Sequence, residues 1–171
     1  MDQARVDQLY RDHGDAVYAF VVSRTGDRML AEDLTGDVFE RVLRSRAPFD
    51  PRRSKGTTWL FTIALNLVRD HHRRQSTRDR TADALWSEPA DSGTPGPDEG
   101  VERRDEVRRA MAVLSDDERD VVSLRFGADL TAPQIAAVTG ERLTTVEGRL
   151  YRALRKLRDA LEEPADTLSR S

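Results

Sequence analysis

The segment 76–100, near the middle of the chain, limits the fold more than any other feature of the sequence. It contains three prolines and three glycines among serine, threonine and aspartate, with only Leu85 and Trp86 as bulky apolar residues. Such a composition cannot bury enough apolar surface to offset the entropy lost on ordering. Acidic side chains also outnumber basic ones in the segment. The sequence therefore predicts a flexible acidic linker with one small domain on each side.

Both flanking parts show the apolar spacing of helices, every three to four residues. Apolar residues from Val6 to Val21 predict one helix, or two that meet near Gly14. Further helices are predicted at about 28–46, 57–75, 101–114, 115–126, 131–138 and 144–161. No strand-like alternation of useful length occurs, so the fold class is all-α. The predicted parts are a domain at 1–75, the linker at 76–100, a helix-turn-helix domain at 101–163 and a tail at 164–171.

Several residues mark where helices begin and end. In a capping box, a Ser or Thr and a Glu or Gln three positions later satisfy each other's free backbone donors. Three pairs in the second half have this spacing: Ser115 with Glu118, Thr131 with Gln134, and Thr144 with Glu147. In the first half, the Thr-Gly-Asp run at 25–27 predicts a helix stop followed by an N-cap.

The strongest functional pattern is a short helix, a glycine-containing turn and a long basic helix at 131–161. This is the layout of a helix-turn-helix, whose second helix enters the major groove of DNA. Between positions 142 and 158 the only acidic residue is Glu147. DNA contacts are predicted for Arg142, Thr145, Arg149, Arg152 and Lys156. A structural helix pair with a solvated basic face is the alternative interpretation.

A second cluster lies in and just before the predicted helix 57–75. Asn66, Arg69 and Arg73 share a face opposite the apolar one. Together with Lys55, Trp59 and Arg74 they combine an aromatic ring, an amide and positive charge. That combination suits unstacked single-stranded DNA. A core tryptophan beside a solvated edge is the alternative.

Other functions have little support in the sequence. The net charge is −3. The sequence contains no cysteine, and this excludes disulfides and thiolate metal sites. No phosphate-binding loop or nucleophile motif occurs, and the adjacent His71 and His72 diverge on a helix, so we expect no enzyme, cofactor or metal site. No long apolar run or signal peptide is present. We therefore expect a soluble, cytoplasmic protein that does not insert into membranes.

Three segments, in this order, resemble extracytoplasmic-function sigma factors of the sigma-70 family: LYRDHGDAVYAFVVSRTGDRMLAEDLTGDVFERVLR, TTWLFTIALNLVRDHHRR and LSDDERDVVSLRFGADLTAPQIAAVTGERLTTVEGRLYRALRKLRDAL. The resemblance implies that the first domain binds core RNA polymerase and opens the minus-10 promoter element. It implies that the second domain reads the minus-35 element of promoter DNA. An anti-sigma factor is a further partner that the resemblance implies.

The resemblance also assigns roles to individual residues. Asp33, Asp37, Val38 and Phe39 match the polymerase-docking motif, and Glu40 continues the acidic stripe that begins at Glu32. Asn66 matches the residue that reads a flipped minus-10 base, with the basic residues around it at its backbone contacts. Arg149, Tyr151 and Arg152 match minus-35 contacts.

Four residues depart from the family pattern. Gly36 stands where glutamine is usual, Glu141 replaces an apolar turn residue, and Glu147 and Gly148 replace a basic residue and a serine. Two other functions stay open. One is a stand-alone helix-turn-helix regulator, and the other is an interaction protein that keeps the docking helix and has lost strong DNA binding.

Overall fold

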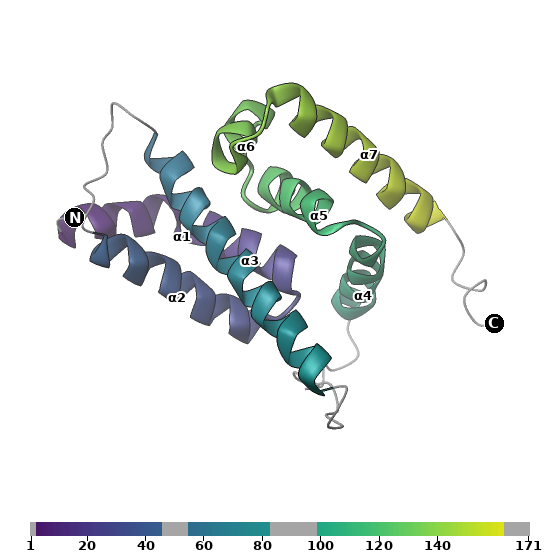
Figure 1. The fold of residues 1–171 in the computed structure, drawn as a ribbon, viewed down its shortest axis with the longest axis horizontal. Coiled ribbons are helices and arrows are strands. Elements are labelled where there is room, and N and C mark those ends of the chain that lie inside the picture. The colour runs from purple at the N-terminus through teal and green to yellow at the C-terminus, as the bar shows by residue number, and fades with distance from the viewer. Residues whose placement is uncertain (1–2, 46–54, 83–98, 163–171) are drawn as a thin grey trace.

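The computed structural model describes residues 3–45, 55–82 and 99–162. These residues form helices and short turns, without strands, which confirms the all-α prediction. The elements are α1 Gln3–Thr25, α2 Arg28–Arg44, α3 Gly56–Ala82, α4 Glu99–Ala112, α5 Asp116–Val122, the π-helical turn η1 Ser123–Gly127, α6 Ala132–Thr139 and α7 Leu143–Glu162 (Figure 1). We call α1–α3 the N-terminal unit and α4–α7 the C-terminal unit.

The connection between α1 and α2, at residues 25–27, forms as the sequence predicted. α1 is one continuous helix that passes through the buried Gly14. It ends at Gly26, whose positive φ of 67° is a backbone conformation that glycine adopts without steric cost. Asp27 then caps α2, its carboxylate accepting a hydrogen bond of 3.1 Å from the amide of Leu30.

α3 is longer than predicted. It continues to Ala82, so residues 76–82 of the predicted linker are helical. These residues include neither glycine nor proline, and the Thr77 hydroxyl donates a hydrogen bond to the Arg73 carbonyl at 3.0 Å. The remainder of the predicted linker up to position 98 lies outside the described residues, as does the tail from position 163.

Two of the three predicted capping boxes form. Ser115 and Thr131 each exchange the expected pair of hydrogen bonds with the side chain three positions later. The third prediction, at Thr144, is wrong. α7 begins one residue earlier, at Leu143, and the Arg142 carbonyl accepts its first hydrogen bond, from the Val146 amide. Thr144 thus lies inside the first turn.

The predicted helix 115–126 is interrupted. α5 ends at Val122, and the next five residues form the π-helical turn η1, in which the Ala128 amide donates to the Ser123 carbonyl at 3.1 Å. Single π turns of this kind often occur at functional positions. Here the turn widens the helix and directs Gly127 toward the N-terminal unit.

The two units are not separate in space. α1 packs against η1, and α3 packs against α6. Buried residues of the N-terminal unit, such as Phe20 and Leu65, belong to the same apolar core as Leu124 and Ile135 of the C-terminal unit. Periodicity along each helix predicts which side is buried, but it does not predict which partner covers that side. The direct contact between the units therefore emerges only in the folded chain.

Gly36 allows a stability prediction. It lies exposed in the middle of α2, and an added Cβ would meet no atom within 4 Å. Because alanine loses less backbone entropy than glycine in a helix, Gly36→Ala should stabilise the protein by about 0.5–1 kcal/mol in chemical denaturation. Gly26→Ala is the matched control and should destabilise, because position 26 needs a positive φ. A loss of stability in Gly36→Ala would contradict the regular geometry of α2 there.

Candidate nucleic-acid interface

The helix-turn-helix of the C-terminal unit is formed by α6 and α7. Gly140, with a φ of 73°, ends α6 and reverses the chain. Val146 and Ala153 hold the inner side of α7 in the core, with both side chains fully buried. The outer side of α7 therefore carries exposed polar and aromatic side chains. Among the predicted minus-35 residues, those exposed are Arg142, Thr145, Glu147, Tyr151, Arg152 and Lys156.

Two of the predicted cations are already paired within the C-terminal unit. Arg149 is mostly buried and binds Glu141, which raises the pKa of the Arg149 guanidinium. Lys156 binds Glu118 at 2.9 Å. Burial alone would raise the pKa of Glu118, but hydrogen bonds from Lys156 and from the Ser115 amide outweigh it and lower that pKa. A DNA phosphate that approached either cation would compete with the carboxylate that already binds it.

These pairs give physical roles to residues that sequence reasoning left unexplained. Glu141, which the resemblance marked as a departure, lies in the turn before α7 and accepts a hydrogen bond from Arg149 of that helix. Arg155 was not among the predicted contacts, although it is exposed on α7 close to Arg152. The concentration of basic residues in α7 is the sequence feature from which Arg155 could have been predicted as a DNA contact. The pairing of Arg149 with Glu141 could not be predicted from the sequence, because it depends on how the turn at Gly140 places Glu141 beside α7.

Glu147 is free of the capping role that the sequence predicted for it. It is exposed in the second turn of α7, away from the helix N-terminus. Glu147→Lys should therefore tighten duplex DNA binding and steepen its salt dependence by about one to two charges. The melting temperature should stay nearly unchanged, because no cap is lost.

The matched control is Glu162→Lys, the same charge change at the far end of α7, which should affect DNA binding much less. Titrations of the full chain at several salt concentrations would measure both variants. Weaker binding of Glu147→Lys at low salt would contradict the prediction and identify Glu147 as a reader of base edges.

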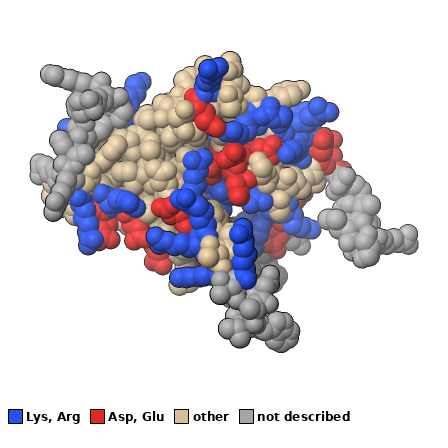
Figure 2. All heavy atoms as spheres, in the orientation of Figure 1, with Lys and Arg blue, Asp and Glu red and all other residues tan. Residues whose placement is uncertain are grey.

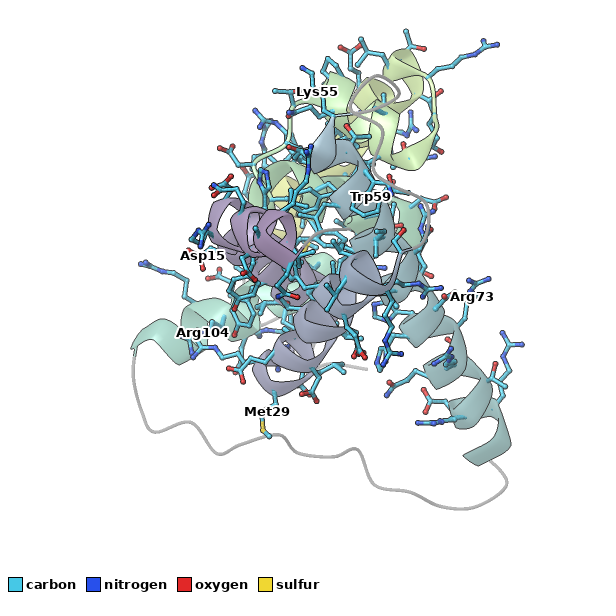
Figure 3. The ribbon with its side chains drawn as sticks, turned by 90° about the vertical axis from the view of Figure 1, so that its left-hand side faces the viewer. Asp15, Met29, Lys55, Trp59, Arg73 and Arg104 are labelled. Carbon is cyan, nitrogen blue, oxygen red and sulfur yellow. The ribbon has the colours of Figure 1, made fainter. Side chains whose placement is uncertain are left out.

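α3 carries the second predicted cluster. Figure 3 shows Lys55 at the start of this helix, just before its first residue, and Trp59 and Arg73 further along it. Lys55, Asn66, Arg73 and Arg74 are exposed. Trp59 is partly buried, and its side chain packs against the shared core, so it contributes to the stability of the fold.

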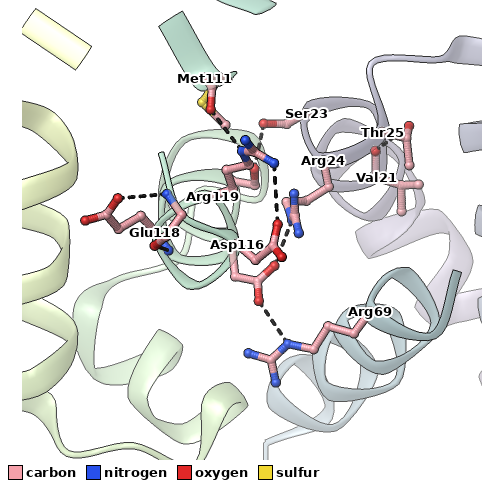
Figure 4. A network of polar contacts seen from close by, with 12 residues as sticks. Val21, Ser23, Arg24, Thr25, Arg69, Met111, Asp116, Glu118 and Arg119 are labelled. Atoms are coloured by element: carbon pink, nitrogen blue, oxygen red, sulfur yellow. Dashed lines mark hydrogen bonds and ion pairs between the residues drawn. The ribbon is translucent and has the colours of Figure 1, made fainter. Parts of the chain in front are cut away.

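Arg69 takes part in a buried network between the units (Figure 4). Asp120 of α5 is 2% exposed and accepts from two arginines of the N-terminal unit. Its Oδ1 accepts from Arg24 Nε of α1 at 2.7 Å, and its Oδ2 accepts from Arg69 Nε of α3 at 2.9 Å. Arg24 is buried as completely as Asp120, whereas Arg69 stays partly exposed. A single carboxylate thus joins three helices.

His72 lies near this network. Burial lowers the pKa of His72 from its usual 6.5, and the positive charge of Arg24 lowers it further. Both effects disfavour the protonated ring, and its buried Nε2 has no hydrogen-bond partner among the described residues. Among the residues that the structure describes, no group of histidine or acidic side chains could hold a metal ion.

α2 carries the predicted polymerase-docking residues. Asp33, Asp37 and Glu40 are exposed, and Glu40 pairs with Arg44 at 2.6 Å. Val38 and Phe39 are buried instead, and Phe39 meets the ring of Tyr10 edge-on. These two residues can therefore influence docking only by holding α2 in place.

Figure 2 shows how charge is distributed on one face of the molecule. Basic side chains gather over α7 and again along the lower edge, and acidic side chains lie between them. The face thus has no single sign, in agreement with the small net charge of −3. Long-range attraction to DNA would come from the basic clusters and not from the chain as a whole.

Family comparisons match both units in order. Residues 9–78 match sigma-70 region 2, and residues 104–157 match sigma-70 region 4. The ECF RNA polymerase sigma factor SigE of Mycolicibacterium smegmatis is 30% identical over 99% of this chain and 68% of its own length. The ECF RNA polymerase sigma factor RpoE of Cereibacter sphaeroides is 29% identical over 92% of this chain and 86% of its own length. BldN of Streptomyces coelicolor is 33% identical over 92% of this chain, which spans 61% of BldN.

Two solved structures have the same fold. The sigma factor RpoE, in complex with the anti-sigma factor NepR from Bartonella quintana, matches with a TM-score of 0.72 and 24% identity, over 91% of this chain and 96% of RpoE. CnrH, in complex with the cytosolic domain of CnrY, matches with a TM-score of 0.71 and 25% identity, over 94% of this chain and 90% of CnrH. None of the helices in the described ranges has the length and apolar character needed to span a membrane.

Proposed function

The chain belongs to the extracytoplasmic-function sigma factors of the sigma-70 family, and we propose that it joins core RNA polymerase and directs promoter recognition and opening. One observation carries this proposal. Regions 2 and 4 of the family match the two helical units in the same order and cover most of both. The chain then contributes recognition, and the polymerase contributes catalysis.

The N-terminal unit, predicted as 1–75, would dock on polymerase and open the minus-10 element. Asp33, Asp37 and Glu40 are exposed along α2, where they can meet basic side chains of a partner. Asn66 is exposed on α3, and its amide can both donate to and accept from the edge of an unpaired base. The surrounding basic residues of α3 would hold the strand's phosphates.

The C-terminal unit, predicted as 101–163, would bind the minus-35 element through α7. Thr145 and Arg152 lie on the outer side of this helix and can reach base edges or phosphates. Arg149 and Lys156 flank the buried side and are held by carboxylates, so they would position the helix or rearrange on contact. Tyr151, 69% exposed, offers a further contact.

An anti-sigma factor is the second protein partner that we propose. The two solved structures described above hold RpoE with NepR and CnrH with the cytosolic domain of CnrY. Since this chain has the same fold, a protein that binds across its helical units would control its access to polymerase.

Charge reversal on α2 tests polymerase docking. The double variant Asp33→Lys with Asp37→Lys should weaken binding to core polymerase by at least about tenfold, because both carboxylates are exposed and reversal replaces attraction with repulsion. Asp15 is exposed on α1, so Asp15→Lys serves as the control for the effect of one charge reversal outside α2. Co-elution of each variant with core polymerase would measure the effect.

Two outcomes of this experiment would contradict the proposal. Undiminished retention of the double variant would place the docking surface elsewhere than on α2. A wild-type chain that does not bind core polymerase at all would contradict the proposed function itself.

A further inference from the structure

Arg152 differs from the two paired cations of α7. Arg149 is held by Glu141, and Lys156 is held by Glu118. Arg152 is exposed, and among the described residues no carboxylate pairs with it. The side chains beside it on α7 therefore decide where its guanidinium lies.

The guanidinium of Arg152 lies over Gly148, one turn earlier on the same helix. Side chains of an α-helix lean toward its N-terminus, so residue 152 covers the surface above position 148. A Cβ built at Gly148 would lie 3.3 Å from Nη1 of Arg152, which is closer than ordinary van der Waals contact. Apart from the neighbouring backbone of α7, no other atom of the described residues comes within 4 Å of that Cβ. The guanidinium thus occupies the space that a side chain at position 148 would take.

The backbone does not require glycine at position 148. Gly26 and Gly140 have positive φ values, whereas Gly148 lies inside the regular helix α7 with a negative φ. Glycine inside a helix also lowers stability relative to alanine. The room that it leaves for Arg152 is therefore the physical role that the structure gives to Gly148.

Gly148 and Arg152 lie on the outer side of α7, in line with Thr145. These positions are three and four residues apart, so they share one helix face. Val146 and Ala153 are fully buried on the inner side. In a helix-turn-helix, the N-terminal part of the second helix meets the base edges. The Arg152 side chain, lying over Gly148, runs along α7 toward that part.

We propose that Gly148 determines the sequence specificity of minus-35 recognition by positioning Arg152. The inference rests on the proposed function of α7, and Gly148 acts in it as a positioning residue. A larger side chain at position 148 would push the flexible guanidinium from its place and leave the helix backbone where it is. Arg152 would then meet other atoms of the duplex, and discrimination at the base pair that it contacts would fall.

Selection from a pool of DNA duplexes with a randomised segment measures this specificity. The full chain assembled with core RNA polymerase would select its preferred duplex, and each base pair of that duplex would then be replaced in turn. Discrimination at a base pair is the ratio of the affinities for the selected and the replaced duplex. Arg152→Ala should abolish a discrimination of about tenfold at one base pair or more, which identifies the contacts of Arg152.

Gly148→Leu should lower discrimination at the same base pair by about fivefold or more, because leucine fills the space of the guanidinium. Gly148→Ala adds only Cβ and should have a smaller effect in the same direction. Both variants should melt at or above the wild-type temperature, since alanine and leucine are better helix formers than glycine. A purely structural role would not give weaker discrimination in a protein of equal or higher stability. Unchanged discrimination in Gly148→Leu would overturn the inference.

The Arg152→Ala background is the matched control, because it keeps the leucine and removes the group that the leucine displaces. Gly148→Leu should weaken binding to the selected duplex by about fivefold in the wild-type background and should leave it unchanged in the Arg152→Ala background. Equal weakening in both backgrounds would mean that the leucine itself meets the DNA, and this result would also overturn the inference.

Core polymerase without the chain gives the baseline for the selection. If the wild-type complex selects a preferred sequence and the Gly148 variants select it with the same discrimination, the inference fails and the proposed function stands. If the wild-type complex selects no sequence beyond the baseline, the proposed function fails, and the role of Gly148 fails with it.

Discussion

Replacing Asp120 with alanine is expected to lower the free energy of unfolding by about 3–5 kcal/mol. The reason is the position of Arg24, whose side chain is 2% exposed and whose Nε donates to Asp120 at 2.7 Å. Without the carboxylate, a buried guanidinium would keep its charge and lose its partner. Urea denaturation followed by circular dichroism would measure the loss.

Asp116→Ala controls for the loss of an acidic residue on α5. Its carboxylate is exposed and pairs with Arg119 at 3.4 Å, so the variant should cost no more than about 1 kcal/mol. The two units should also unfold less cooperatively in Asp120→Ala, because the network that joins them is gone. An effect as small as that of Asp116→Ala would contradict the buried network.

Replacing Asn66 with alanine is expected to reduce promoter opening by about ten- to a hundredfold, the effect of losing one good contact to a base edge. Asn66 is exposed on α3 and is not part of the core, so the fold should not change. Binding to core polymerase and to duplex minus-35 DNA should therefore stay nearly intact. Opening kinetics, polymerase co-elution and duplex titration would measure the three activities.

Gln75→Ala is the matched control for Asn66→Ala. It removes an exposed amide from the same helix, two turns further on, and should leave promoter opening unchanged. Equal losses in all three activities of Asn66→Ala would identify Asn66 as a structural residue and would contradict its role in base reading.

Local signals in the sequence predicted much of the fold. The stop at Gly26, the cap at Asp27 and the capping boxes at Ser115 and Thr131 all form, because each depends on neighbouring backbone groups alone. The capping box predicted at Thr144 does not form, since the turn after Gly140 starts α7 one residue earlier. Boundaries of this kind depend on how the preceding turn places the chain.

Contacts between distant residues could not be predicted in this way. Asp120 reads as one of several acidic residues in a solvated helix, and only the folded chain places it between Arg24 and Arg69. Arg69 was predicted from its spacing as a nucleic-acid contact, and its ion pair with Asp120 was not foreseen. The roles of the predicted DNA and polymerase contacts remain predictions that mutation must test.

Run-off transcription tests the central claim most directly. The full chain, core RNA polymerase and a template that carries the DNA upstream of the protein's own gene would be combined, with core polymerase alone as the control. A sigma factor should yield a discrete transcript that is absent without the chain and is strongly reduced in Asn66→Ala. Binding of the chain to core polymerase without any specific transcript, on this template or on a library of promoter sequences, would contradict the assignment of promoter recognition and opening to this protein.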